Sequence, residues 1–277
     1  MSSTRPDIHI ADDLLAATKR TAGEHVAWAE VAARDCAVDE RPELRAALAR
    51  VHERLADTDF RLALVGEFSS GKSTFINALL DEPPLFPERW LKTSSLATTG
   101  AATEVRHGDL ALEARLAGHA EPLAFTGRGC ALVEAIAEHL DGEEPPADMT
   151  GMLRVLTTDA RLAGVVEGVR LTHPDPLLGE HVVLVDTPGI NANEDYAHHA
   201  EVTRRAVQRA DTALVFIPAD RPLSLALQRF LDEELEPYLP RCVFLVSRLA
   251  RIDAGERDAV IAWVRDQIAE RFGIEDP

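Results

Sequence analysis

The sequence contains few cysteines, and they lie far apart. Cys36, Cys130 and Cys242 form neither a Cys-x-x-Cys pair nor a set with metal-ligand spacing. This usage indicates a reducing cytosol and excludes a zinc module of ordinary spacing. We expect the three thiols to fill core positions.

An excess of positive charge is also missing. The 277 residues include 29 Lys and Arg against 47 Asp and Glu, which gives a formal net charge of −18. Attraction of the whole chain to nucleic acid or to an anionic membrane is therefore disfavoured, and no local basic patch offsets the acidic balance. We expect no nucleic-acid partner.

Long apolar runs are absent as well. No stretch of about 18 uncharged apolar residues occurs, and the opening "MSSTRPDIHIADD" has no basic segment followed by an apolar run. The sequence thus lacks both a spanning segment and a standard export signal. We expect a cytoplasmic protein.

The first part of the chain is predicted to be helical. Residues 10–57 are rich in Ala, Glu and Arg, and an apolar stripe recurs at spacings of four, three and four residues over Leu44, Leu48, Val51 and Leu55. That spacing places the four side chains on one helical face. We therefore predict a helical segment over residues 1–57 that belongs to a helical bundle.

From Phe60 the pattern changes to short apolar runs. "FRLALVG", "HVVLVDTPG", "TALVFIP" and "CVFLVS" alternate with amphipathic segments at 195–210, 223–236 and 255–272. This alternation predicts an α/β fold, a doubly wound and mainly parallel sheet with helices on both faces, over residues 58–277. Residues 105–180, with a predicted helix at 129–140, are interpreted as an elaboration of that sheet.

A phosphate-binding loop is predicted at "GEFSSGKS", which has the form Gly-x4-Gly-Lys-Ser. Its lysine is one of only three in a chain that otherwise uses arginine, and a compact ammonium can reach the β- and γ-phosphates. The glycines let the backbone wrap the phosphates at the start of a helix, and the serine hydroxyl can bind magnesium. The expected nucleotide-binding residues here are Gly66, Ser69, Ser70, Gly71, Lys72, Ser73 and Thr74.

Two further elements complete the predicted site. Asp186, at the end of a buried strand in "VVLVDTPG", can hold a magnesium-bound water, and Gly189 can present its N–H to the γ-phosphate. Asp-Thr-Pro-Gly alone is also ordinary turn chemistry, so the prediction rests on both motifs following strands in this order. Between them, Thr98 and Thr99 lie in a Gly- and Ala-rich stretch that can close over the metal.

These residues resemble the bacterial dynamin-like GTPases. The resemblance lies in "GEFSSGKSTFINALL", "LATTGAATEVRHG", "LLGEHVVLVDTPGINAN" and "ADRPLS". It implies Mg²⁺-dependent hydrolysis of GTP to GDP, with Ser69, Lys72, Thr98 and Thr99 in catalysis and Ser73, Thr98, Thr99 and Asp186 around the metal.

The resemblance also implies partners. Pairing of two GTPase domains would stimulate hydrolysis, either in a homodimer or in a hetero-oligomer with a paralogue. Membrane remodelling would act through regions absent here, with the chain peripheral at the inner face of the membrane. Residues 1–57 would be neck helices, and the GTPase domain would lack its last strand.

The guanine-recognition motif departs from the family pattern. Asn/Thr-Lys-x-Asp is expected after the fifth strand, whereas Ser247 and Arg248 are followed by Leu249 and Ala250. A shifted frame ending at Asp253 restores a carboxylate. Two alternatives stay open: Asp253 or a backbone group selects guanine, or the chain is a relaxed-specificity NTPase or nucleotide-gated interaction module with little hydrolysis.

Overall fold

A computed structural model describes residues 59–80, 101–174, 178–179, 181–190 and 196–274. Thr98, Thr99 and the predicted helices of residues 1–57 lie outside these ranges, and so does the predicted boundary at residue 58. The described residues from Phe60 onward belong to one compact unit. The domain division therefore stays a prediction.

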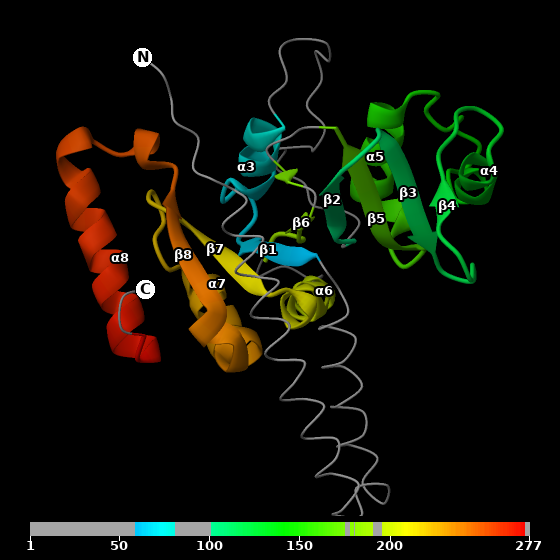
Figure 1. The fold of residues 1–277 in the computed structure, drawn as a ribbon. Helices are drawn as coiled ribbons and strands as arrows, with labels where there is room; N and C mark the ends of the chain where they lie inside the picture. The colour runs from blue at the N-terminus through cyan, green and yellow to red at the C-terminus, as the bar shows by residue number, and fades with distance from the viewer. Residues whose placement is uncertain (1–58, 81–100, 175–177, 180, 191–195, 275–277) are drawn as a thin grey trace, which may run out of the picture. The chain divides into compact units, whose positions relative to one another are not determined.

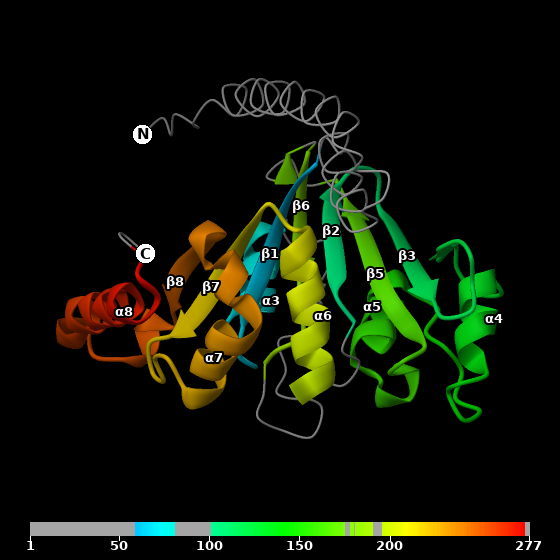
Figure 2. The same ribbon diagram turned by 90° about the horizontal axis from the view of Figure 1, so that it is seen from below.

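A single mixed sheet organises this unit. Its order is β4-β3-β5-β2-β6-β1-β7-β8, as Figures 1 and 2 show. In the described ranges the strands are β1 (Phe60–Gly66), β2 (Thr103–His107), β3 (Ala111–Leu116), β4 (Leu123–Ala124), β5 (Val166–His173), β6 (Val182–Asp186), β7 (Thr212–Pro218) and β8 (Cys242–Ser247).

The half of the sheet that carries the predicted motifs is parallel. β1 pairs in parallel with β6 and β7, and β7 pairs in parallel with β8. β2 runs antiparallel to β6 and parallel to β5, and β3 runs antiparallel to both β5 and β4. The predicted elaboration at 105–180 is thereby confirmed as an extension of the same sheet.

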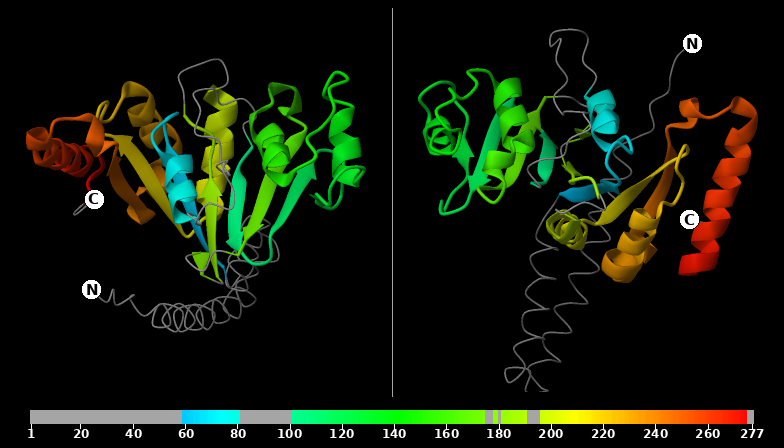
Figure 3. Two further views of the ribbon diagram at one scale, coloured as in Figure 1. Left: turned by 90° about the horizontal axis from the view of Figure 1, so that it is seen from above. Right: turned by 180° about the vertical axis from the view of Figure 1, so that it is seen from behind.

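Helices cover both faces of the sheet, which confirms the doubly wound α/β prediction. α3 (Lys72–Leu79), α4 (Ala131–Ala137) and α5 (Met149–Thr158) pack on one face, and α6 (Tyr196–Arg209), α7 (Leu225–Phe230) and α8 (Arg257–Phe272) pack on the other (Figure 3). β1 divides its side chains between the two cores. Leu64 packs with Ile76 of α3, whereas Ala63 and Val65 pack with Phe230 of α7.

Two local predictions need correction. The helix predicted over 223–236 ends at Phe230 and continues as a π-helix over Leu231–Leu235 and a 3₁₀-helix over Glu236–Arg241. Pro237 lies at the start of the 3₁₀-helix, and in an α-helix its ring would clash with the carbonyl four residues earlier, so the turn before it departs from α-helical geometry. Cys130 and Cys242 are only half-buried and pack against the two cores instead of filling them.

The parallel strands bring their carboxyl ends to one edge. The register aligns Leu64 with Asp186, Gly66 with Phe216, and Pro218 with Ser247. Ligands of open α/β sheets bind at this edge. Within the described ranges, no helix combines the length and apolarity needed to cross a bilayer.

Candidate functional site

The loop after β1 has the backbone that a phosphate cradle requires. Gly66 (φ 151°) and Gly71 (φ 112°) are both in conformations that side chains disfavour, and Ser69 between them is left-handed (φ 57°). A Cβ on Gly66 would lie 2.8 Å from the carbonyl oxygen of Phe216. Gly71 is the N-cap of α3, so the loop runs directly into a helix N-terminus.

Lys72 is buried inside this loop. Its Nζ donates hydrogen bonds to the carbonyl oxygens of Gly66 (2.8 Å) and Glu67 (3.0 Å), and the residue is 6% exposed. Burial lowers the Lys72 pKa to about 8, although the carboxylates of Asp186 and Glu67 raise it in part. The ammonium is thus placed among backbone groups that phosphate oxygens can replace as its partners.

Ser73 and Asp186 meet across the sheet edge. The Ser73 Oγ donates a hydrogen bond of 2.8 Å to Oδ2 of Asp186. The other carboxylate oxygen, Oδ1, is buried with no hydrogen-bond partner. Burial raises the Asp186 pKa, against opposing contributions from Lys72 and from the Ser73 hydrogen bond. A hydroxyl beside a buried, partly unsatisfied carboxylate is a donor set that suits Mg²⁺.

The segment after β6 is docked on the phosphate loop. The Thr187 Oγ1 donates to the Leu64 carbonyl at 2.6 Å, and the Ile190 N–H donates to the Gly66 carbonyl at 3.2 Å. A Cβ on Gly189 would come within 2.7 Å of the Phe68 Cα. Only glycine fits at this approach, and its backbone is thereby held beside the loop.

Ser247 joins the end of β8 to the same loop. Its Oγ donates a 2.6 Å hydrogen bond to the carbonyl oxygen of Ser70. The next residue, Arg248, is left-handed (φ 60°), and its Nη1 lies 3.5 Å from Oδ2 of Asp220, which follows β7. Asp253 is exposed and precedes a 3₁₀ turn at Ala254–Glu256.

The structure thus gathers most of the predicted residues at one edge, with Ser69 and Thr74 exposed there. Sequence reasoning missed three side chains. Glu67 is 7% exposed, and its Oε2 is buried without a hydrogen-bond partner. Thr187 and Asp220 were not singled out. The signal available for all three was their position, in or next to the two motifs or directly after a strand.

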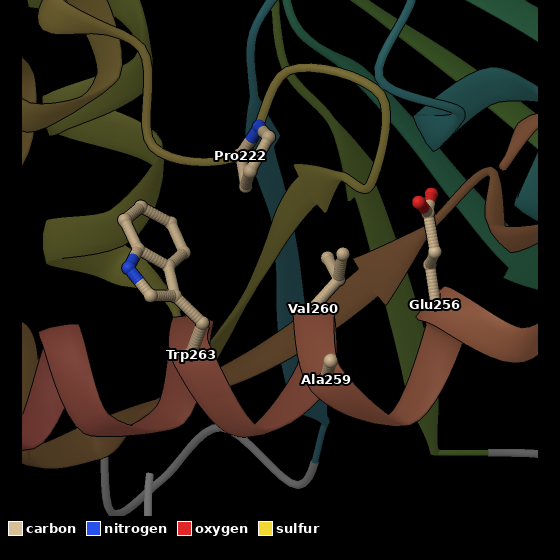
Figure 4. A pocket seen from close by; sticks show the side chains of 5 residues that line it. All are labelled: Pro222, Glu256, Ala259, Val260 and Trp263. Atoms are coloured by element: carbon tan, nitrogen blue, oxygen red, sulfur yellow. The ribbon is translucent and has the colours of Figure 1, made fainter.

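A shallow, open apolar pocket lies on the surface apart from the phosphate loop. It has a volume of about 450 Å³ and is found between α8 and the segment that follows β7. Figure 4 shows the side chain of Trp263 beside Pro222, with Val260 between Trp263 and Glu256. Trp263 is 46% exposed. Nothing in its lining carries phosphate chemistry.

Curated proteins share part of this sequence. A probable transmembrane GTPase, FZO-like, from the chloroplast of Arabidopsis thaliana is 26% identical over 222 residues, which are 79% of this chain and 18% of that protein. Dynamin-like protein A of Bacillus subtilis (strain 168) is 25% identical over 227 residues, or 79% of this chain and 16% of that protein. The chain therefore spans less than a fifth of each of these curated relatives.

A solved structure shares the fold. It is one of an oligomerised bacterial dynamin pair, described as providing a mechanism for long range sensing and tethering of membranes. The TM-score is 0.53 at 13% identity, over 98% of this chain and 44% of that one.

The sequence profile of the dynamin family matches residues 62–249, more than half of the chain. That span contains the phosphate loop, the Ser73–Asp186 pair, Gly189 and Ser247. The chain belongs to the dynamin family.

Proposed function

We propose that the chain binds Mg·GTP at the edge formed by β1, β6, β7 and β8 and hydrolyses it to GDP. One observation carries the proposal. Lys72, Ser73 and Asp186 meet around a loop whose backbone is shaped by Gly66 and Gly71. Lysine, hydroxyl and carboxylate are the three side-chain types that nucleoside triphosphate sites use at these positions.

Ser73 and Asp186 would hold the metal. The unpartnered Oδ1 of Asp186 offers an acceptor, and the Ser73 hydroxyl is already oriented toward that carboxylate. When bound, Mg²⁺ neutralises charge on the β- and γ-phosphates.

Lys72 would position the phosphates. Its ammonium now has two carbonyl partners, and phosphate oxygens can replace them because both lie within the loop that wraps the ligand. The N–H groups at the start of α3 add the positive end of a helix. Gly189, held against Phe68, can then present its N–H to the γ-phosphate.

Hydrolysis would depend on residues around the open side of the loop. Ser69 is exposed there, and we propose that it acts with Thr98 and Thr99, which lie outside the described residues. Pairing of two such domains, or of one with a paralogue, would exclude water and order these groups. Membership in the dynamin family supports the proposal, as do a relative named as a probable transmembrane GTPase and a solved structure of an oligomerised dynamin pair that shares the fold.

We place the function at a membrane surface, with the chain peripheral on the cytoplasmic side and other regions making the membrane contact. The solved dynamin pair is described as sensing and tethering membranes, and this supports the placement. Vesicle flotation of the protein containing these residues tests it. Recovery only in the vesicle-free fraction under all nucleotide conditions would contradict it.

A second candidate is favoured by Ala250, which stands where the family places the guanine-reading carboxylate. In that case the chain is a relaxed-specificity NTPase or a nucleotide-gated interaction module with little hydrolysis. Equal affinity for guanine and adenine analogues would support the relaxed NTPase. Binding without turnover at any protein concentration would support the interaction module.

Calorimetric titration with non-hydrolysable GTP and ATP analogues in magnesium tests binding, and phosphate release across a range of protein concentrations tests turnover. We expect GTP turnover that rises more than linearly with protein concentration. Lys72→Ala should abolish binding and turnover, whereas Arg265→Ala, at an exposed position of α8, should change neither. Unchanged turnover in Lys72→Ala would overturn the proposal.

A further inference from the structure

The position of a bound nucleobase follows from the sheet order. β1, which carries the phosphate loop, lies between β6 and β7, and β8 lies beyond β7. On the β6 side the segment from Thr187 to Ile190 is already docked on the loop. We therefore expect a nucleotide whose phosphates occupy the loop to extend its base toward the ends of β7 and β8.

An ion-paired cluster lies at the ends of β7 and β8. Asp220 follows β7, and its Oδ2 is 3.5 Å from Nη1 of Arg248 and 3.5 Å from Nη1 of Arg251. Arg248 comes directly after Ser247, which is hydrogen-bonded to the phosphate loop. Ser247 thus connects the cluster to the phosphate loop.

The three side chains differ in exposure. That of Arg248 is 15% exposed, that of Asp220 is 25% exposed, and that of Arg251 is 61% exposed. The separations of 3.5 Å exceed the roughly 2.7–2.9 Å of a tight charge-assisted hydrogen bond. Asp220 therefore orients Arg248 without saturating its five N–H donors.

Donors at this position match one edge of guanine. With Ala250 in the motif, the frame that starts at Ser247 has no carboxylate to accept from the N1–H and N2 amino groups. The opposite purine edge of guanine has two acceptors, O6 and N7, which a planar guanidinium can engage together. Adenine carries an amino donor at the position of O6, so the same fork does not fit it.

We propose that Arg248 selects guanine through its O6 and N7 atoms, and that Asp220 is the positioning residue that aims Arg248. This inference rests on the proposed binding of nucleotide at the phosphate loop. In this arrangement the guanidinium of Arg248 donates hydrogen bonds to the base, whereas the carboxylate of the family motif accepts them. Recognition therefore takes place at the O6 and N7 edge and not at the N1 and N2 edge.

Nucleotide analogues that lack single atoms test the proposal on the full chain. The 7-deaza analogue of the non-hydrolysable GTP lacks the N7 acceptor, and the inosine analogue lacks only the N2 amino group. We expect the parent to bind the 7-deaza analogue about tenfold more weakly than the GTP analogue, and to bind the inosine analogue as tightly as the GTP analogue.

Variants of Arg248 and Asp220 test whether the ion-paired cluster causes these differences in affinity. Arg248→Lys keeps the charge but loses the fork, so both the preference for guanine over adenine and the 7-deaza effect should fall about tenfold. Asp220→Asn, which removes the negative charge, should reduce the same two ratios. Asp220→Glu, which keeps a carboxylate, should leave both ratios close to those of the parent. Arg265→Lys, exposed on α8 and paired with the adjacent Asp266, is the matched control and should change no ratio.

Three results would overturn the proposal. Weaker binding of the inosine analogue, with no 7-deaza effect, would show that a carboxylate such as Asp253 reads the N1 and N2 groups. Equal weakening of every triphosphate by Arg248→Lys would show that Arg248 supports the phosphates instead of reading the base. Failure of the parent to bind any triphosphate would remove the proposed function itself, whereas the first two results leave it intact.

Discussion

Gly189 lies against the backbone of Phe68 so closely that a Cβ at position 189 would be 2.7 Å from the Phe68 Cα and 2.9 Å from its nitrogen. The contact joins the segment after β6 to the phosphate loop after β1. Because both partners are backbone, the contact cannot be relieved by rotating a side chain. The two motifs found in the sequence are therefore parts of one packed unit.

Gly189→Ala is expected to separate these two segments. The steric overlap of the added Cβ with the Phe68 backbone should lower the free energy of unfolding by about 1–3 kcal/mol. Because the Gly189 N–H is proposed to face the γ-phosphate, the displacement should also reduce the preference for triphosphate over diphosphate. Gly255→Ala is the matched control, because a Cβ at position 255 would meet nothing within 4 Å. Chemical denaturation and calorimetry measure the two effects. Identical behaviour of the two variants would contradict the close approach.

Ser247→Ala is expected to loosen the phosphate loop. The variant leaves the Ser70 carbonyl without the 2.6 Å hydrogen bond from Oγ and should lose about 1 kcal/mol of stability. Affinity for triphosphate should fall with it. Thr158→Ala removes a hydroxyl-to-backbone bond of similar kind, from Thr158 Oγ1 to the Arg154 carbonyl on α5, and should leave nucleotide affinity unchanged. Equal affinities in the two variants would argue against a link between β8 and the loop.

Asp186→Asn is expected to raise the magnesium concentration needed for tight triphosphate binding. The amide preserves the shape of the side chain but removes its negative charge, so metal affinity falls. Titration of Mg²⁺ at fixed nucleotide analogue measures the shift. Asp211→Asn is the control, because Asp211 accepts its hydrogen bond from the Arg61 N–H at the opposite end of β7. An unshifted magnesium midpoint in Asp186→Asn would exclude this residue from the metal site.

The lowered pKa of Lys72 predicts a pH dependence of stability in the nucleotide-free chain. The folded-state pKa is about 8, against an ordinary value of 10.5, so between these values the unfolded chain binds more protons. The stability contributed by this group therefore rises as pH increases from 8 to 10.5 and is complete above 10.5; it is lost progressively as pH falls from 10.5 to 8 and is absent below 8. The shift corresponds to about 3 kcal/mol.

Comparison with Lys72→Met isolates that contribution. The free energy of unfolding of the parent should increase relative to the variant by about 3 kcal/mol between pH 8 and pH 10.5. Urea denaturation at several pH values measures the difference. A constant difference across this range would show that the ammonium is not desolvated in the folded state.

The two described cysteines should differ in reactivity. Burial raises the pKa of Cys242 to about 11, although Arg241 lowers it in part. Burial also acts to raise the pKa of Cys130, but hydrogen bonds from the backbone of Thr126, Val133 and Leu132 outweigh it, and the pKa is lowered overall. The reactive species is the thiolate.

In a Cys36→Ser background, iodoacetamide at pH 8 is therefore expected to alkylate Cys130 at least about tenfold faster than Cys242. Mass spectrometry of the digested chain measures both rates in one sample. Denaturation with urea provides the control, because it should make the two rates similar. Equal rates in the folded chain would contradict the opposite environments of the two thiols.

Features that depend on short stretches of chain can be predicted from the sequence. The spacing from Gly66 to Ser73 predicts the loop and the start of α3, because glycine backbone freedom and helix initiation are local properties. Apolar runs predict β1, β6, β7 and β8. The role of Asp186 in the metal site is predicted from its position at the end of one of these runs. Thr98, Thr99 and the helices of residues 1–57 stay predictions.

Contacts between distant groups, by contrast, depend on how the whole domain folds. The sheet order that places β1 between β6 and β7, the burial of Glu67, and the bond from Ser247 to Ser70 across 177 residues are not encoded in any local pattern. Strand pairing and buried hydrogen bonds depend on the packing of the whole domain, because each is favourable only where its partner has already been brought close. For the same reason the pairing of Asp220 with Arg248 was visible only in the folded chain.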